Sequence, residues 1–188
     1  MTISEHLISL ATEAETLATH VQTRFGGLSV AELNWKPNAE RWSIAQCLHH
    51  IITTNTAYFP AFEQVIQSKY SPTLVQRVPF IPRLLGRELI RILGREPLRK
   101  IKTSPMFEPS TSTIAKEIIG GFALHQSRIS TYLRGFSALD IERVVISAPQ
   151  SGFLIFPLYD ILVATVNHEF RHVRQAEKVI QAVNFGIV

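Results

Sequence analysis

The sequence predicts an all-α fold, specifically a four-helix bundle, on two observations. Four long segments repeat apolar residues every three or four positions, as amphipathic helices do. No strand-like alternation of any length competes with them, and one long, proline-rich and basic connection separates the second segment from the third. Four such helices joined with one longer crossover are typical of a four-helix bundle. With 188 residues, 46% of them hydrophobic, we expect a single domain spanning residues 1–188.

The first two helices are predicted from their apolar spacing and from a capping signal. The first is expected over residues 3–25, and a loop that contains glycines and a proline follows it. The second begins at WSIAQ, where Ser43 and Gln46, three positions apart, form a capping box. Its apolar face continues as far as Val65.

The connection that follows, residues 69–112, is interrupted by six prolines. Within it, RLLGRELIRILGRE predicts a short helix that ends before Pro97. A third long helix is predicted over residues 113–136. SAPQSGFLIFP is expected to form a connection rich in turn residues, and the fourth helix is predicted over residues 158–183.

Cysteine content and hydropathy indicate the compartment. Cys47 is the single cysteine, which excludes an internal disulfide and a cysteine-rich zinc site and favours a reducing environment. No segment is long and apolar enough for a membrane helix, and the first 20 residues have the pattern of an amphipathic helix rather than of a signal peptide. We therefore expect a soluble, cytoplasmic protein.

The fourth helical segment contains HEFRH, which fits the H-E-x-x-H zinc motif of many metalloproteases. His168 and His172 project from one face of a helix, but the further ligand that proteases need is missing: a metzincin histidine would fall at Lys178, and the only acid downstream is Glu177. We therefore do not expect a protease. Glu169 lies about 100° from the histidine stripe and is expected to be an ordinary helix-face residue.

If the two histidines bind a metal, a third ligand must come from upstream. The best candidates are the adjacent His49 and His50 on the second helix. At about 100° per residue, His49 falls opposite the apolar stripe and should face solvent, whereas His50 lies at its flank and can face the interior. The alternative is that the histidines only form hydrogen bonds within the core.

The segments WSIAQCLHH and HEFRHVRQ together resemble the motifs of the DinB-like, or YfiT-like, family of metal-binding four-helix bundles. That family has a histidine eight residues after the tryptophan of a W-[ST] helix start, matched here by Trp42 and His50. It also has an H-x3-H pair followed three residues later by glutamine, matched by His168, His172 and Gln175. NWKP and LYDILVATVNHE are similar as well. The resemblance implies a DinB-like domain with a metal site formed by His50, His168 and His172.

The resemblance also implies an activity. Three histidine ligands leave coordination positions open, as catalytic metal sites do, and zinc or nickel is the expected divalent metal. The resemblance implies a metal-dependent S-transferase that uses a low-molecular-weight thiol, such as bacillithiol, mycothiol or glutathione, or else a hydrolase. We expect a small-molecule substrate or thiol as partner, leave a homodimer open, and do not expect contact with nucleic acid or a membrane. No catalytic or cofactor-binding residue beyond the metal ligands is assigned.

The alternative is a non-catalytic metal-binding or stress-related protein whose basic segment 83–99 contacts an anionic partner. Residues 69–102 hold nine Lys and Arg against two Glu. Five arginines recur every four residues and would form a basic stripe on a helix: Arg83, Arg87, Arg91, Arg95 and Arg99. Such a stripe can bind anionic lipid or nucleic acid, but a solvated face of the domain is the more common outcome. It could also line the mouth of the metal site and attract an anionic substrate or thiol.

Three further residues have open roles. His125 falls on the inward face of the third helix, where it could be a fourth ligand, a hydrogen-bond partner of a ligand or a substrate contact, although a satisfied core histidine is favoured. Gln175 could approach the metal site from one turn below His172 or cap a neighbouring helix. Cys47 is expected to be a core residue.

Overall fold

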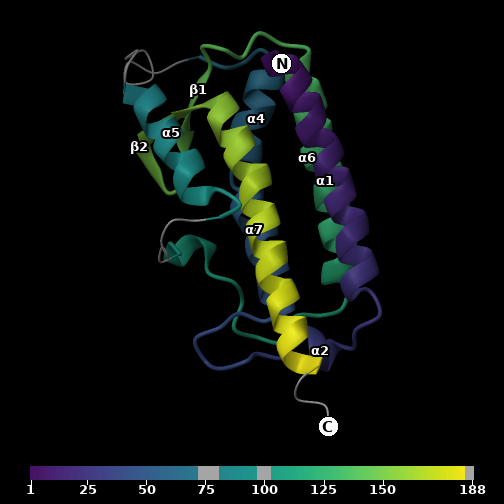
Figure 1. The fold of residues 1–188 in the computed structure, drawn as a ribbon. Helices are drawn as coiled ribbons and strands as arrows, with labels where there is room; N and C mark the ends of the chain where they lie inside the picture. Colours follow the sequence, from purple (N-terminus) through teal and green to yellow (C-terminus); the bar gives the residue numbers. More distant parts are fainter. Residues whose placement is uncertain (72–80, 97–102, 185–188) are drawn as a thin grey trace.

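The structure is a computed structural model that describes residues 1–71, 81–96 and 103–184, and it is mostly helical (Figure 1). This confirms the predicted all-α fold class. The elements in chain order are α1 (Ile3–Phe25), α2 (Val30–Asn34), α3 (Ile44–Thr56), α4 (Phe59–Ile66), α5 (Ile81–Leu93), the short 3-10 helix η2 (Pro105–Phe107), α6 (Ile118–Ser137), β1 (Val145–Ala148), β2 (Ser151–Pro157) and α7 (Leu158–Asn184).

The long helices lie side by side around α7. Figure 1 shows α7 in the centre, with α1 and α6 on one side and α5 and the hairpin of β1 and β2 on the other. Helix α1 packs along α6, while α7 contacts α3, α5 and α1. Helix α7 is therefore covered on several sides.

Two clusters of buried apolar side chains form the core. One is centred on Phe62 and Phe136, and the other contains Phe25 and Phe122. Along α7, the first cluster ends at Val166 and the second begins at Val173. The turns that carry His168 and His172 therefore lie between two apolar layers.

The start of α3 is fixed as the sequence predicts. Ser43 Oγ accepts a hydrogen bond from the Gln46 backbone N at 3.1 Å, and Gln46 Oε1 accepts one from the Ser43 backbone N at 3.2 Å. The Gln46 amide also donates to the carbonyl oxygen of Ser110 at 2.9 Å. The capping box thus ties the first turn of α3 to the connection that precedes α6.

Two predicted helix boundaries are wrong. The second helix does not run unbroken to Val65, because α3 ends at Thr56 and α4 starts at Phe59, with Pro60 in its first turn. Proline lacks an N–H donor and disfavours the helical conformation in the residue before it, so the helix is interrupted there.

The third helix, α6, begins at Ile118 rather than at residue 113. The segment before it is held outside the helix by the side chain of Asn34. The backbone N of Ile114 donates to Asn34 Oδ1 at 2.8 Å, and Asn34 Nδ2 donates to the Ile114 carbonyl at 2.8 Å. With both backbone groups of Ile114 bonded to α2, the helix starts after it.

The predicted connection before α7 is instead an antiparallel hairpin, β1 paired with β2. Its pattern escapes a search for alternation because the strands are short and consecutive residues of β2, Phe153 and Leu154, are both exposed. The backbone N of Leu158 donates to the Val144 carbonyl at 2.8 Å. The hairpin therefore fixes where α7 begins.

The short helix predicted within the basic connection is α5, and it ends before Pro97 as expected. It packs against α7 and β2. Gly86 permits this approach, since a Cβ at that position would lie 2.9 Å from Pro157 Cδ and still closer to the Asp160 carboxylate. Helix α5 therefore forms a wall close to the first turns of α7.

The arginine stripe is only partly described. Arg87 and Arg91 are exposed on α5, but α5 ends at Leu93, so Arg95 lies beyond the helix. The side chain of Arg83 and the whole of Arg99 lie outside the described residues. The expectation of one helical stripe that continues through Arg95 is therefore wrong.

Within the described ranges, no helix combines the length and the apolar character needed to cross a lipid bilayer.

Candidate metal centre

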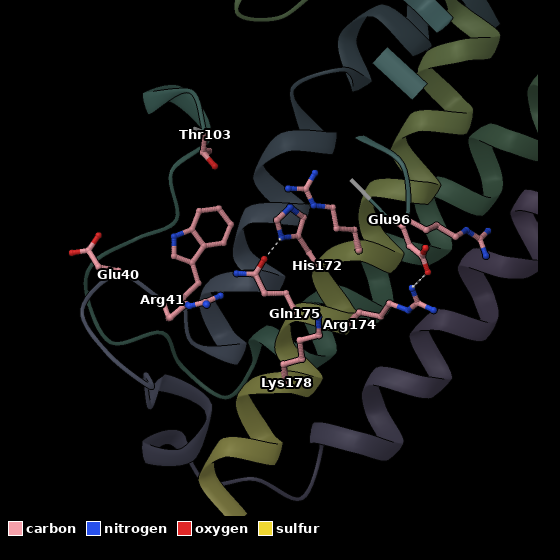
Figure 2. A pocket seen from close by; sticks show the side chains of 11 residues that line it. Glu40, Arg41, Glu96, Thr103, His172, Arg174, Gln175 and Lys178 are labelled. Atoms are coloured by element: carbon pink, nitrogen blue, oxygen red, sulfur yellow. Dashed lines mark hydrogen bonds and ion pairs between the residues drawn. The ribbon is translucent and has the colours of Figure 1, made fainter. Parts of the chain in front are cut away.

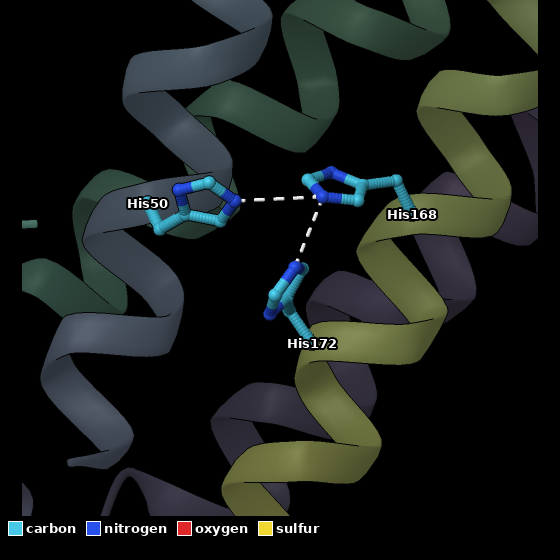
Figure 3. A group of neighbouring side chains, drawn as sticks. All are labelled: His50, His168 and His172. Atoms are coloured by element: carbon cyan, nitrogen blue, oxygen red, sulfur yellow. Dashed lines mark hydrogen bonds between the residues drawn. The ribbon is translucent and has the colours of Figure 1, made fainter. Parts of the chain in front are cut away.

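Three histidines from two helices that are far apart in the sequence meet in the interior (Figure 3). His50 extends from α3, and His168 and His172 extend from successive turns of α7. Nε2 of His168 lies 3.4 Å from Nε2 of His50 and 3.0 Å from Nε2 of His172. Each side chain is buried, with at most 6% of its surface exposed. The structure thus brings together the three histidines that the sequence analysis grouped.

Hydrogen bonds on the far side of two rings determine which nitrogen faces the centre. Nδ1 of His50 lies 2.7 Å from the carbonyl oxygen of Phe107, and Nδ1 of His172 lies 3.1 Å from Oε1 of Gln175. Both oxygens can only accept, so each Nδ1 carries the proton and each Nε2 presents a lone pair. The lone pairs of His50 and His172 therefore both point toward Nε2 of His168.

Hydrogen bonds among the three histidines cannot satisfy all of these lone pairs, whereas a metal ion can. His168 can donate at most one hydrogen from Nε2, so it can satisfy only one of the two lone pairs that face it. A divalent metal would accept a lone pair from all three rings, and the three ligand atoms lie within 4.8 Å of one another. Imidazole nitrogens of this kind suit zinc, nickel, copper or iron. The residues present therefore fit a divalent transition metal.

The electrostatic environment keeps the three rings neutral. Burial, followed by the nearby histidines and Arg171, lowers the pKa of His168 well below its ordinary value. Burial likewise lowers the pKa of His172 to about 3 and also lowers that of His50. A neutral imidazole is the form that binds a metal, so the site does not need to lose protons at neutral pH.

Trp42, the residue before the cap of α3, packs against two of the rings. Its ring centroid lies 4.7 Å from that of His50 and 5.5 Å from that of His172, and the planes of Trp42 and His172 are 26° apart. Such packing restricts the rotamers of both histidines. The tryptophan of the sequence motif therefore has a physical role, which is to hold ligand rings from two helices.

The neighbouring histidines lie outside the cluster. His49 is half-buried rather than fully exposed, and its Nδ1 lies 3.4 Å from Thr53 Oγ1. His125 is buried, stacks on Phe59 with centroids 5.5 Å apart, and accepts a hydrogen bond from Asn55 Nδ2 at 3.2 Å. Burial lowers the pKa of His125 to about 4. These contacts support the interpretation of His125 as a core histidine.

Glu169 is not the helix-face residue that the sequence predicts, because it is completely buried. Asn55 Nδ2 donates to its Oε1 at 2.6 Å, and burial raises its pKa to about 8 despite the nearby amides of Gln126 and Asn55. The Gln126 amide, although close enough to lower that pKa, makes no hydrogen bond of normal geometry. The prediction fails because α7 is covered by several helices, so residues well away from the histidine stripe are also enclosed.

Glu169 is turned into the core, where its Oε1 accepts a hydrogen bond from Asn55, so it is not placed as the general base of an H-E-x-x-H protease would be. Cys47 is a core residue, as predicted. It is completely buried, and burial raises the pKa of its thiol, so the thiol is not available as a nucleophile.

A cavity of about 280 Å³ opens onto the three histidines. Its apolar wall comes mainly from α5, η2 and α7, and Thr54, Tyr58 and Thr165 also line it. Burial raises the pKa of Tyr58 to about 12, so its hydroxyl stays protonated and can donate a hydrogen bond. The cavity is near the lower end of the range for small-molecule sites.

A second, larger pocket of about 640 Å³ also reaches His172 (Figure 2). Figure 2 shows the hydrogen bond between His172 and Gln175, with Arg41 and Lys178 also facing the pocket. Five basic side chains and two acidic ones line it: Arg41, Arg95, Arg171, Arg174 and Lys178, with Glu40 and Glu96. The surroundings of the metal centre therefore combine an apolar cavity with a basic pocket.

Sequence reasoning assigned no role to three residues of the site. Phe107 lies in the proline-rich connection, where no periodic pattern marks it, and it contributes its backbone carbonyl. Tyr58 lies at the break between α3 and α4. Arg171 lies between the two histidines of HEFRH, and its spacing of three from His168 is the one available signal.

Comparison with known proteins agrees with the motif and the geometry. A model of the DinB superfamily matches residues 13–176, a range that contains the three histidines, Trp42 and Gln175. No curated protein and no solved structure matches the chain. The match covers most of the 188 residues. The chain belongs to the DinB superfamily.

Proposed function

We propose that the protein is a metal-dependent enzyme in which His50, His168 and His172 bind one divalent transition metal, zinc or nickel. The observation that supports this most strongly is the convergence of three Nε2 atoms while oxygen acceptors hold the Nδ1 atoms of His50 and His172. Three protein ligands are the number that catalytic sites use when a further position is left for water or substrate.

The proposed reaction is transfer to or from a low-molecular-weight thiol, or hydrolysis. A bound divalent metal lowers the pKa of a coordinated thiol or water and so supplies a nucleophile at neutral pH. The chain itself supplies the surroundings: apolar side chains of α5 and η2 line the cavity beside the three histidines. The protonated Tyr58 hydroxyl can orient a substrate by donating a hydrogen bond.

Metal content tests the first part of the proposal. Untagged wild-type protein, purified without chelator, is compared by inductively coupled plasma mass spectrometry with His50→Ala and His172→Ala. The matched control is His49→Ala, which removes the adjacent histidine outside the cluster. We expect about one zinc or nickel per chain in the wild type and in His49→Ala, and loss of the metal in the other two variants.

Absence of metal from the wild type after reconstitution with zinc and with nickel would refute the site. Metal that remains in His50→Ala would show that α3 contributes no ligand. The second part is tested with loaded protein, glutathione, bacillithiol or mycothiol, and a chromogenic electrophile, with a chromogenic ester as the hydrolysis substrate. Turnover that does not depend on His50 would separate the reaction from this site.

The alternative of a non-catalytic protein with an anion-binding segment at 83–99 has less support. Arg91 lies 3.3 Å from Glu88, so the two form an ion pair, and Arg95 pairs with Glu13 and packs over the ring of Phe170. Two of the described arginines are thus already engaged within the domain.

A further inference from the structure

Arg171 is a half-buried cation at the junction of the two cavities. It lines both the 280 Å³ cavity and the 640 Å³ pocket, as His172 and Thr103 also do. Among the residues that the structure covers, it forms no ion pair, and its hydrogen bond is from Nη1 to the Ile92 carbonyl at 3.3 Å. A guanidinium group has five N–H donors, so most of its hydrogen-bonding capacity remains for a ligand.

Other arginines of the same pocket are already paired. Arg174 lies 3.3 Å from Glu96, and Arg95 is paired with Glu13. Arg41 and Lys178, by contrast, have no carboxylate partner in the described parts of the chain. The basic pocket therefore contains three cations that form no ion pair within the described parts of the chain.

These three cations line the pocket that also contains His172. Figure 2 shows Arg41 to the left of Gln175 and Lys178 below it, with Glu40 further out at the left edge. Arg171 is the residue before His172 and lies close enough to lower the pKa of all three histidines. An anion bound by Arg171 would therefore lie beside the metal ligands.

A partly buried cation without a counter-charge is unfavourable, and such groups persist where a ligand supplies the opposite charge. The guanidinium fork matches the geometry of carboxylate and phosphate oxygens. The cavity on the other side of Arg171 is walled by apolar side chains, including Leu89, Ile92 and Ile161. The two cavities together would accommodate a molecule with an apolar part and an anionic end.

We propose that Arg171, assisted by Arg41 and Lys178, binds a carboxylate or phosphate group of the small molecule that reacts at the three-histidine centre. The less polar part of that molecule occupies the 280 Å³ cavity. The assignment of this molecule as substrate or thiol rests on the proposed function. Anion binding itself requires only the arginine and lysine side chains.

The test measures binding of three probes that share one apolar tail: hexanoate, hexyl phosphate and 1-hexanol. Isothermal titration calorimetry is performed on zinc-reconstituted wild type, Arg171→Met, Arg171→Lys and Arg143→Gln. Arg143 is the matched control because it is exposed and lies outside the lining of both cavities. Metal content and far-UV circular dichroism of each variant establish that the site and the fold are intact.

We expect at least one anionic probe to bind the wild type about tenfold or more tightly than 1-hexanol, since hydrogen bonds to charged groups contribute most. Arg171→Met should lose this preference, Arg171→Lys should keep part of it, and Arg143→Gln should keep all of it. The tighter of the two anions identifies the group as carboxylate or phosphate. Equal binding of all three probes, or equal losses in Arg171→Met and Arg143→Gln, would overturn the proposal.

A second arm separates this inference from the metal function. The same titrations on His50→Ala, whose altered side chain lines only the apolar cavity, measure anion binding without the cluster. Persistent, Arg171-dependent binding in a protein that takes up no metal would leave the anion site standing while the proposed function fails. Anion binding that disappears with the metal and does not respond to Arg171→Met would mean that the metal, not Arg171, holds the anion.

Discussion

Nδ1 of His172 donates a hydrogen bond to Oε1 of Gln175, 3.1 Å away and one helical turn further along α7. The glutamine of the sequence motif therefore contributes to the site by fixing which nitrogen of His172 faces the cluster. Phe107 does the same for His50 through its backbone carbonyl. Two acceptors from different parts of the chain thus hold the protons on Nδ1, so that the Nε2 lone pairs of His50 and His172 are available to one metal ion.

Gln175→Leu should weaken metal binding about 10- to 100-fold, because the acceptor that fixes the tautomer and orientation of His172 is lost. Gln175→Glu keeps an acceptor oxygen at this position and should retain most of the affinity. Competition with a chromogenic zinc chelator measures the dissociation constants. Equal affinities for wild type and Gln175→Leu would show that the hydrogen bond to His172 has no part in binding.

Phe107→Ala should also weaken metal binding, by about tenfold. The Phe107 side chain is 7% exposed and anchors the short helix η2, so its removal would free the carbonyl that holds His50. Met106→Ala is the matched control, since the adjacent Met106 is 55% exposed. The chelator competition applies here too, and an equal effect of both substitutions would argue against a specific role for the carbonyl of Phe107.

The proximity of the three histidines could be anticipated from the sequence, because helical geometry relates spacing to direction and the motif resemblance grouped the same residues. His172 lies four positions after His168, and the apolar stripe of the second helix distinguishes His50 from His49. The partners across the chain could not be predicted in this way. The approach of Phe107 to His50 depends on how the proline-rich connection folds back, and no periodic pattern specifies that path.

Glu169 shows a second limit of helical periodicity. The prediction for Glu169 used its angle of about 100° from the histidine stripe and assumed that residues off the stripe face water. Helix α7, however, has neighbours on several sides. Pro60 shows the opposite case: its effect on the second helix follows from backbone chemistry alone and could have been anticipated from the sequence.

The pKa of about 8 for buried Glu169 predicts a specific pH dependence of stability. Since the folded-state pKa is raised above the ordinary 4.5, the folded protein binds more protons than the unfolded chain between pH 4.5 and 8. Stability is therefore lost as the pH rises through this window. Glu169→Gln, which keeps an oxygen for Asn55, should remove that loss.

Urea unfolding of metal-free wild type and Glu169→Gln at pH 5, 6.5 and 8 measures this effect. We expect the advantage of the glutamine variant to grow with pH and to level off above pH 8, reaching the order of a few kcal/mol. Other buried groups titrate alike in both proteins, so their contributions cancel when the unfolding free energy of the wild type is subtracted from that of Glu169→Gln. A difference that stays constant from pH 5 to pH 8 would mean that Glu169 is ionised in the folded state throughout.

Gly86 determines how closely α5 approaches α7, and through α5 it shapes the cavity beside the histidines. An added methyl group would meet Pro157 and the carboxylate of Asp160, so either Asp160 or the whole of α5 must move. Such overpacking costs about 1–3 kcal/mol, which exceeds the gain of about 1 kcal/mol that alanine brings to a helix. Gly86→Ala should therefore be destabilised overall in urea unfolding.

Gly120→Ala is a control for which the opposite change in stability is expected, because Gly120 lies in α6 and a Cβ there would meet nothing within 4 Å. It should be stabilised by about 0.5–1 kcal/mol. Since Leu89 and Ile92 of α5 line the cavity, Gly86→Ala should also weaken binding of the hexyl probes, whereas Gly120→Ala should not. If Gly86→Ala were as stable as Gly120→Ala and bound the probes normally, the close packing of α5 on α7 could not be what shapes the cavity.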